Sequence, residues 1–269
     1  MKHLTQHCDP APRISIAIMA LVCLAIASLY AGGAQAQSNA SSEALVVEAS
    51  QSLEWDQNKG IYRAVGNAKA QQGSQIIEAD ELTASYDAQT EGSDITQIIG
   101  KSNVLFVDGS QRGQGSYLVY DQTNQSYTLD GPDARVTGPD GKATALTQIF
   151  YDKNAAKITL TDDAEVFMTD GRELAADLIH ILLDDEQNVS TIEAIGTVRV
   201  KQPNGQTATS DKADYNKTEN TALFSGNVVI MENDSVLTGD RAEIDFTSGI
   251  SRMLSSRSGQ RIKGRFTTR

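Results

Sequence analysis

The stretch ADYNKTENTALFSGNVVIMEND, from Ala213 to Asp234, decides the fold of this chain. It contains a Tyr-Asn pair, a polar turn, a short apolar run, a Gly-Asn dipeptide and then alternating apolar residues. Similar stretches occur earlier in the chain, near Tyr120 and near Tyr151. The chain therefore repeats one loose pattern, which contains no cysteine, metal-binding cluster or catalytic signature.

The repeated unit is about 31 residues long and begins with an aromatic or aliphatic residue followed by Asp or Asn. The seven pairs are Trp55-Asp56, Tyr86-Asp87, Tyr120-Asp121, Tyr151-Asp152, Leu183-Asp184, Tyr215-Asn216 and Ile244-Asp245. Successive pairs are 31, 34, 31, 32, 32 and 29 residues apart. Such a period is typical of units that stack along one axis and bury their apolar faces against their neighbours.

Each pair is followed by a polar turn, a short apolar run and then a second group of turn-forming residues. The second groups are Gly66-Asn67, Asn103, Pro132-Asp133, Asp162-Asp163, Gly196-Thr197 and Gly226-Asn227. Gly, Asn and Asp tolerate positive φ and satisfy local amides, so we expect a turn between two short strands at each group. Each repeat would then hold about four strand-length runs.

Beyond each group, apolar and polar residues alternate strictly, which predicts half-buried β-strands rather than helices. Polar side chains such as Lys69, Arg135, Glu165 and Arg199 fall on one face. The candidate interior residues on the opposite face are Val104, Phe106, Val136, Val166, Met168, Val198, Val200, Val228 and Ile230. The pattern predicts an all-β fold, and if the strands are shared between two facing sheets, the interior is aliphatic and contains few aromatic residues. The two ends of such a stack would carry unpaired edge strands, which invite strand addition by another chain.

The N-terminus resembles a secretory signal peptide over residues 1–36. Lys2 and Arg13 flank a basic region, Ile14–Tyr30 is continuously apolar, and Ala34-Gln35-Ala36 fits a small-x-small cleavage site. An uncleaved anchor is the alternative, at the short end of the length that spans a bilayer. Both cysteines, at positions 8 and 23, lie in this segment, so the mature chain suits an oxidising compartment and has no disulfide framework.

Charge and residue inventory narrow the function further. The chain has a formal net charge of −12, which disfavours nucleic acid as a partner. His180 is the only histidine after residue 36, so the chain has too few residues for a histidine-based metal site or a nucleophilic triad. We therefore expect no metal, no cofactor and no enzyme activity. Carboxylates are abundant, which leaves a two-carboxylate glycosidase as a distant alternative, but they are spread evenly along the repeat. We expect the repeated Asp residues to stabilise turns rather than to bind calcium.

Three segments carry a resemblance to a known family. EADELTASYD (78–87), SDKADYN (210–216) and FSGNVVIMEND (224–234) follow the form A-D-x-L-x-x-x-Y-D with a later G-N-V. Together with the predicted secretory signal, they resemble the OstA-like family, which comprises the periplasmic lipopolysaccharide-transport protein LptA and its relatives. The resemblance covers about residues 44–250 and rests on the order and repetition of the motifs.

The resemblance implies an elongated, open β-jellyroll of two facing antiparallel sheets, a "β-taco", over residues 37–250. Its apolar groove would shield the acyl chains of lipopolysaccharide, with the nine interior residues as the groove lining. Protomers would join end to end and, with an inner-membrane LptC-like protein and an outer-membrane LptD-like barrel, bridge the periplasm.

Two features leave the interpretation open. Residues 251–269 contain six basic and no acidic residues, and we expect a mobile tail there that meets anionic lipid head groups or the acidic body of a neighbour. The alternative to a lipid carrier is a secreted structural or scaffold repeat protein whose sheets pack tightly and leave no groove.

Overall fold

The computed structural model describes residues 46–87, 95–132, 134–138, 141–185, 188–255 and 262–266. The predicted signal peptide lies outside the described residues. The all-β prediction is confirmed, since every regular element in these ranges is a strand. The eighteen strands are β1 (Val46–Glu48), β2 (Ser52–Asp56), β3 (Ile61–Gln72), β4 (Gln75–Tyr86), β5 (Ile95–Asp108), β6 (Gln111–Asp121), β7 (Ser126–Asp130), β8 (Ala134–Gly138), β9 (Gly141–Ala145), β10 (Gln148–Asp152), β11 (Lys157–Met168), β12 (Glu173–Leu183), β13 (Val189–Lys201), β14 (Thr207–Asn216), β15 (Thr221–Glu232), β16 (Ser235–Asp245), β17 (Ile250–Leu254) and β18 (Lys263–Arg265).

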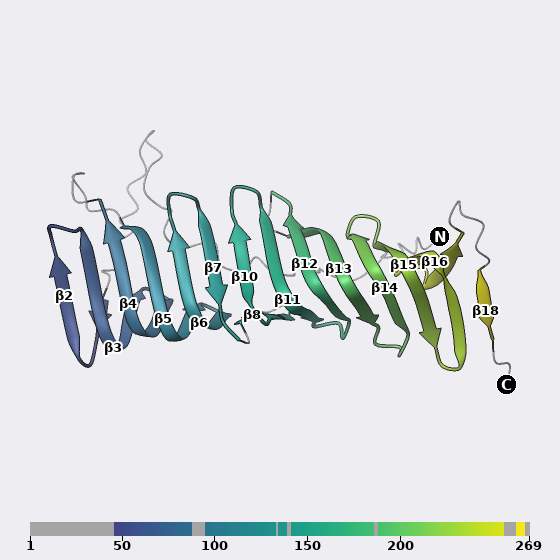
Figure 1. The fold of residues 1–269 in the computed structure, drawn as a ribbon, viewed down its shortest axis with the longest axis horizontal. Coiled ribbons are helices and arrows are strands. Elements are labelled where there is room, and N and C mark those ends of the chain that lie inside the picture. Colours follow the sequence, from purple (N-terminus) through teal and green to yellow (C-terminus); the bar gives the residue numbers. More distant parts are fainter. Residues whose placement is uncertain are drawn as a thin grey trace, which may run out of the picture.

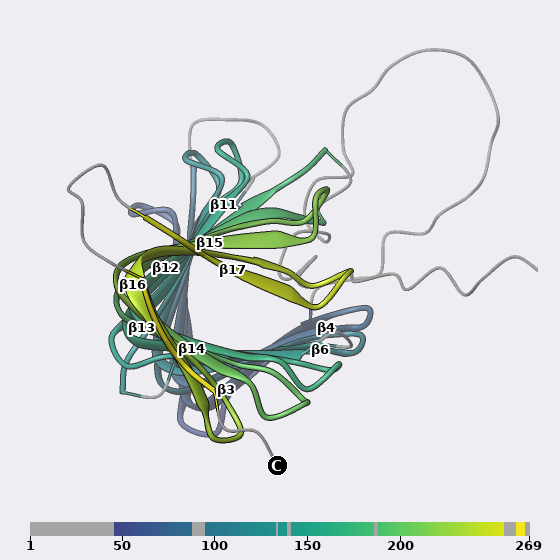
Figure 2. The same ribbon diagram turned by 90° about the vertical axis from the view of Figure 1, so that its right-hand side faces the viewer.

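The strands stack side by side into an elongated body (Figure 1). Viewed along its length, the body has two layers that converge on one side and diverge on the other (Figure 2). The first layer runs from β2 to β7 and from β10 to β17, with every neighbouring pair antiparallel. The second layer contains β1, β8, β9 and β18 together with the other halves of the long strands. This is the open jellyroll that the resemblance implied.

The long strands cross from one layer to the other at a row of β-bulges in alternate strands, and this row forms the side that we call the corner. Register shifts mark the crossing in β3 between Val65 and Ala68, in β13 between Ile195 and Val198, and in β15 between Ser225 and Val228. The same shift occurs in β5 and β11. The prediction that the Gly-Asn-type groups separate two short strands is therefore wrong at these places: positive φ at both residues bends one continuous strand. Only around Pro132 does the chain leave the strand, between β7 and β8.

One Asp of the repeat, at positions 80, 177 and 211, belongs to the same corner, where it follows Ala in two repeats and Ser in the third. The side-chain amide of Asn103 donates to Asp80 at 2.9 Å, and that of Asn227 donates to Asp211 at 2.9 Å. The Thr197 hydroxyl replaces the amide in one repeat and donates to Asp177 at 3.2 Å. In these three repeats, residues that lie 16 to 23 positions apart in the sequence therefore pair side by side on neighbouring strands.

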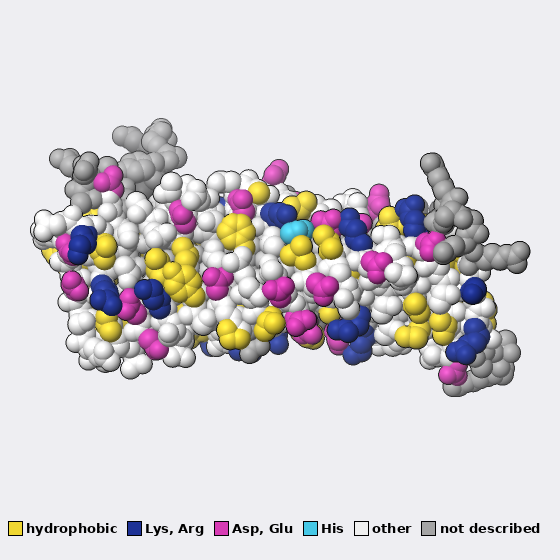
Figure 3. Space-filling view, viewed as in Figure 1, with side chains coloured by type: hydrophobic (Ala, Val, Ile, Leu, Met, Phe, Trp, Pro, Cys, Tyr) yellow, Lys and Arg dark blue, Asp and Glu magenta, His cyan; other side chains and the backbone are white. Residues whose placement is uncertain are grey.

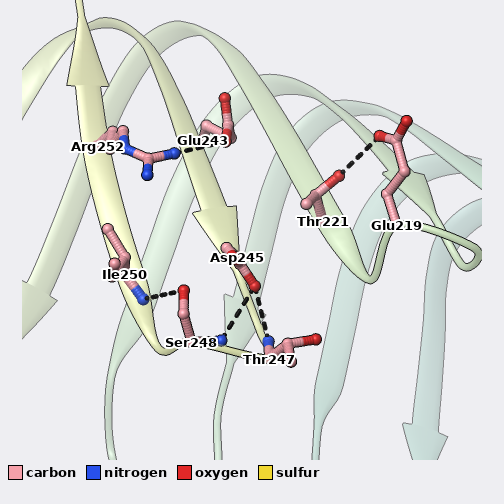
Figure 4. Close-up of polar contacts among 8 residues, drawn as sticks. All are labelled: Glu219, Thr221, Glu243, Asp245, Thr247, Ser248, Ile250 and Arg252. Carbon is pink, nitrogen blue, oxygen red and sulfur yellow. Dashed lines mark hydrogen bonds and ion pairs between the residues drawn. The ribbon is translucent and has the colours of Figure 1, made fainter.

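The Asp of the pair that begins a repeat closes a hairpin of the first layer at several described turns. Asp245 accepts hydrogen bonds from the backbone N–H groups of Thr247 at 2.9 Å and Ser248 at 3.1 Å (Figure 4). Asp56 and Asp121 accept equivalent bonds in their own turns. The expectation that these residues stabilise turns is confirmed, and no group of His, Cys, Asp and Glu that could hold a metal occurs in the described ranges.

The outer faces carry the charged residues that the alternation predicts. Glu81 bridges Arg63 at 2.8 Å and Lys101 at 3.5 Å across three adjacent strands. Glu193 pairs with Lys212 at 2.7 Å in the same way. Both signs of charge are interspersed over the face shown in Figure 3. These exposed pairs favour strand register and solubility more than stability.

The two-layer sheet continues into the predicted C-terminal tail. Strand β17 pairs with the first-layer half of β16, and β18 pairs with its second-layer half. Arg252 lies on β17 and bonds Glu243 at 3.1 Å (Figure 4). The described part of this basic segment is thus an extension of the sheet.

Candidate functional site

The nine candidate residues all lie on the inner face of the second layer. Cross-strand pairing aligns Phe106 with Gly113 and then with Val136, and continues through Ala143 to Val166. The same row runs on through Val200 to Ile230. Val104, Val198 and Val228 form a second row, next to the corner. Met168 lies two residues beyond Val166 on β11, farther from the corner than the first row. The alternation of apolar and polar residues therefore identifies which side chains of these strands face the interior.

Burial separates the nine into two groups. Six are almost wholly buried and belong to the core: Val104, Val136, Val166, Val198, Val228 and Ile230. The side chains of Phe106, Met168 and Val200 are half-buried. The inner face thus includes both packed core and surface that faces free space.

An apolar cavity of about 590 Å³ occupies the half of the body built from β1 to β10, which we call the N-terminal half. Phe106 and Val136 are the two candidate residues that line it. Gly113 lies between them on the neighbouring strand and leaves space where other repeats carry larger side chains. The first layer contributes the opposite wall, with lining residues Leu53, Ala64, Leu82, Leu118, Leu129 and Ile149.

Aromatic residues line the cavity, so the prediction of an interior with few aromatics is wrong here. Tyr120 stacks on Tyr127 with ring centroids 4.6 Å apart, and Tyr127 stacks on Tyr151 at 6.3 Å. Tyr62, which also lines the cavity, stacks on Trp55 at 5.7 Å. The alternation after the Gly-Asn groups does not reveal this wall, whose residues follow the equally regular alternation in first-layer strands such as β6 and β7.

The interior of the other half, β11 to β18, is filled by its own side chains. We call this the C-terminal half. Phe224, Leu160 and Ile179 are each 0% exposed within it. A pocket of about 50 Å³ lies beside them, lined by Met168, Val200 and their neighbours. One chain therefore combines a large apolar chamber with a small one.

Arg172 lies at the rim of this small pocket in the C-terminal half. It belongs to the loop between β11 and β12 and forms an ion pair with Asp170 at 2.8 Å. Its guanidinium carbon lies 5.3 Å from the centroid of the Phe246 ring. Burial opposes the charge of Arg172, but its bonds to Asp170 and its interaction with Tyr215 outweigh burial, so the pKa of Arg172 is raised and the side chain stays charged.

His180 has a structural setting. It lies on the outer face of β12, where Nδ1 is 3.1 Å from the Thr159 hydroxyl. Burial, reinforced by the charge of Lys157 and opposed by that of Glu193, lowers the pKa of His180. Within the part of the chain that the structure describes, no helix is long and apolar enough to span a membrane.

Fold and site together define an open β-jellyroll of stacked hairpins that encloses an apolar chamber. The family of LptA/(LptD N-terminal domain) LPS transport proteins matches residues 47–157, 151–250 and 207–263, and the chain belongs to this family. Among solved structures, the chain is similar to LptH from Pseudomonas aeruginosa, described as the LptA homologous periplasmic component of the conserved lipopolysaccharide transport device. That similarity has 12% identity, 84% coverage of this chain, 96% coverage of that chain and a TM-score of 0.22. No curated protein matches the chain.

Family membership confirms the resemblance found in the sequence. The chain is an LptA-like component of lipopolysaccharide transport, and its family is one of transport proteins. Lipopolysaccharide is the substrate of the transport assembly that this family serves.

Proposed function

We infer that this chain is a periplasmic carrier that binds lipopolysaccharide, shields its acyl chains in the apolar interior and forms part of a bridge between the inner and outer membranes. The observation that carries this inference is the apolar cavity of about 590 Å³ inside the N-terminal half of a protein from this family. Lipid carriers need such a space, whereas a scaffold does not.

The energetics favour hydrocarbon as the occupant. Each methylene transferred from water to an apolar site gains about 0.8 kcal/mol, so a chain of about twelve carbons gains about 10 kcal/mol. The cavity walls are leucines, a phenylalanine and stacked tyrosines, and these offer the acyl chain few polar groups to desolvate. We assign direct contact with acyl chains to Phe106 and Val136, and assign Met168 and Val200 to the same role when the second pocket opens. The remaining five candidates then support the wall from the core.

Both ends of the body support end-to-end assembly. At one end β2 and β1 each pair only with β3, and at the other β17 and β18 each pair only with β16, among the described strands. Leu53 and Trp55 on β2 are 58% and 57% exposed. Strand addition between these ends would join the interiors of successive protomers and cover the two side chains. An LptC-like protein and an LptD-like barrel would terminate the assembly at the two membranes.

The predicted signal peptide, residues 1–36, would deliver the chain to the periplasm. The described ranges contain no cysteine, so folding there would not depend on disulfide formation.

Photo-crosslinking in living cells tests the carrier function at single-residue resolution. A photoreactive residue at Phe106, on the cavity wall, should form an adduct with lipopolysaccharide. The same residue at Leu105, the neighbour whose side chain points to the outer face of β5, serves as the matched control and should form none. Equal adduct yields at both positions, or none at either, would contradict the carrier function and favour the scaffold.

A further inference from the structure

The two chambers differ in volume far more than in the chemistry of their lining. The N-terminal chamber measures about 590 Å³, whereas the C-terminal pocket measures only about 50 Å³ although its lining is also apolar. If acyl chains pass along the whole body, as the proposed function requires, the second chamber has to enlarge. A contact that ties the two layers together at the rim of this pocket would oppose that enlargement.

Arg172 makes that contact across the mouth, by which we mean the side of the body opposite the corner. Its loop joins the second-layer halves of β11 and β12, where Phe167 pairs with Glu173. Phe246 follows β16 in a first-layer hairpin, next to the Asp245–Ile250 pair. The stacking of Arg172 on Phe246 therefore connects the free edges of the two layers directly over the pocket.

Arg172 is positioned by an ion pair with Asp170 in the same loop, and another anion could take the place of this carboxylate. Asp170, in the same loop, holds the guanidinium through Nε and Nη2, both at 2.8 Å. The Arg172 side chain is 13% exposed and that of Asp170 is 42% exposed, so an anion can reach the pair from solvent. A guanidinium fork fits phosphate as well as carboxylate, and a phosphate carries more charge.

We propose that Arg172 is a latch across the mouth of the C-terminal half, released when the phosphate of an acylated lipid takes the place of Asp170. The acyl chain of the same molecule enters the pocket as the layers separate. The latch couples the arrival of an anionic head group to the opening of the second chamber, and an uncharged lipid with the same chain does not release it. This proposal rests on the proposed carrier function.

The separation of the layers can be measured with two spin labels. Thr169 and Thr218 lie in exposed loops on the two sides of the mouth, and the full chain, with Cys8 and Cys23 replaced by Ser, offers no other thiol for labelling. We expect lysophosphatidate with a palmitoyl chain to shift the distance distribution to longer values. Palmitoylglycerol, which has the same chain without phosphate, and inorganic phosphate alone should leave it unchanged. An equal shift with palmitoylglycerol would overturn the proposal.

Variants separate the latch from general packing. Arg172→Ala should show the long distance before lipid is added, whereas Arg199→Ala, on an outer face, should match the parent chain. Asp170→Asn weakens the competing bond, so half-maximal opening should need several-fold less lysophosphatidate. If Asp170→Asn and Arg172→Ala both behave as the parent does, Arg172 is not a latch.

Failure of the latch and failure of the carrier function give different results. Crosslinking from Phe106 reports occupation of the first chamber independently of the mouth. If the Phe106 adduct forms while the labels do not move, the carrier function stands and the latch is wrong. If no adduct forms, the carrier function itself is wrong.

Discussion

Gly226 and Asp211 fit against each other at the corner with no room for a side chain between them. A Cβ added to Gly226 would lie 2.8 Å from the Cβ of Asp211 and still closer to its carboxylate. Gly226 also has a φ of +77°, which L-residues with a side chain rarely adopt. Gly196 faces Asp177 in the same way, so the bulges of β13 and β15 each need a residue without a side chain opposite an Asp.

Replacement of Gly226 by Ala should destabilise the fold by about 2 kcal/mol or more, because the strained φ and the overlap with Asp211 add together. Gly249→Ala is the matched control, since Gly249 has a similar φ of +70° but open space around its Cα. Gly249→Ala should lower the free energy of unfolding only through its strained φ, by about 1 kcal/mol. Urea unfolding of the two variants measures the difference, and equal costs would show that the corner contact is unimportant.

The inner face could be predicted from the sequence because alternation has only two outcomes along a strand. Val136 and Val166 both point inward as the pattern required. The corners could not be predicted, because Gly226-Asn227 with positive φ has the same local chemistry in a hairpin turn as in a bulge. The position of the cavity was also beyond the sequence. Val136 lines the large chamber, whereas Val166 lies in the packed core. The two valines differ in this way because the side chains on the strands opposite them differ in volume.

Val198→Asp and Arg199→Asp should differ sharply although the residues are adjacent. Val198 is 1% exposed in the filled half, so a carboxylate there has no water and no partner, and the variant should lose about 3 kcal/mol or more of stability. Arg199 is exposed on the opposite face, and its replacement should change stability by about 0.5 kcal/mol or less. Thermal unfolding measures both, and a tolerated Val198→Asp would contradict the strand register.

Acid should weaken the hairpins of the first layer. Backbone and side-chain hydrogen bonds from Ser248 hold the pKa of Asp245 below its ordinary value of 3.8. Because the folded-state pKa is the lower one, the carboxylate stabilises the fold fully above the unfolded value, and this contribution is lost as the pH falls through the folded value. The loss should therefore begin near pH 4 and grow toward lower pH.

Asp245→Asn is the variant that tests this titration. An amide can still accept the turn hydrogen bonds, as Asn216 does from the Glu219 N–H at 3.2 Å in another repeat. The stability difference between parent and variant should shrink as the pH drops from about 6 to about 2.5. A difference that is independent of pH across this range would show that the carboxylate charge does not act at the turn.

Gly113 offers a way to fill the cavity without straining the protein. A Cβ at this position would meet Leu129 at 3.7 Å and Phe106 at 3.8 Å, both ordinary contact distances. Gly113→Val should therefore keep the stability of the parent while its side chain occupies space that an acyl chain would use. We expect affinity for a fluorescent fatty acid to fall about tenfold, the equivalent of about 1.4 kcal/mol. Gln114→Val, one residue along on the exposed face of β6, is the control and should bind as the parent does. If Gly113→Val binds as tightly as the control, the acyl chain does not occupy this chamber.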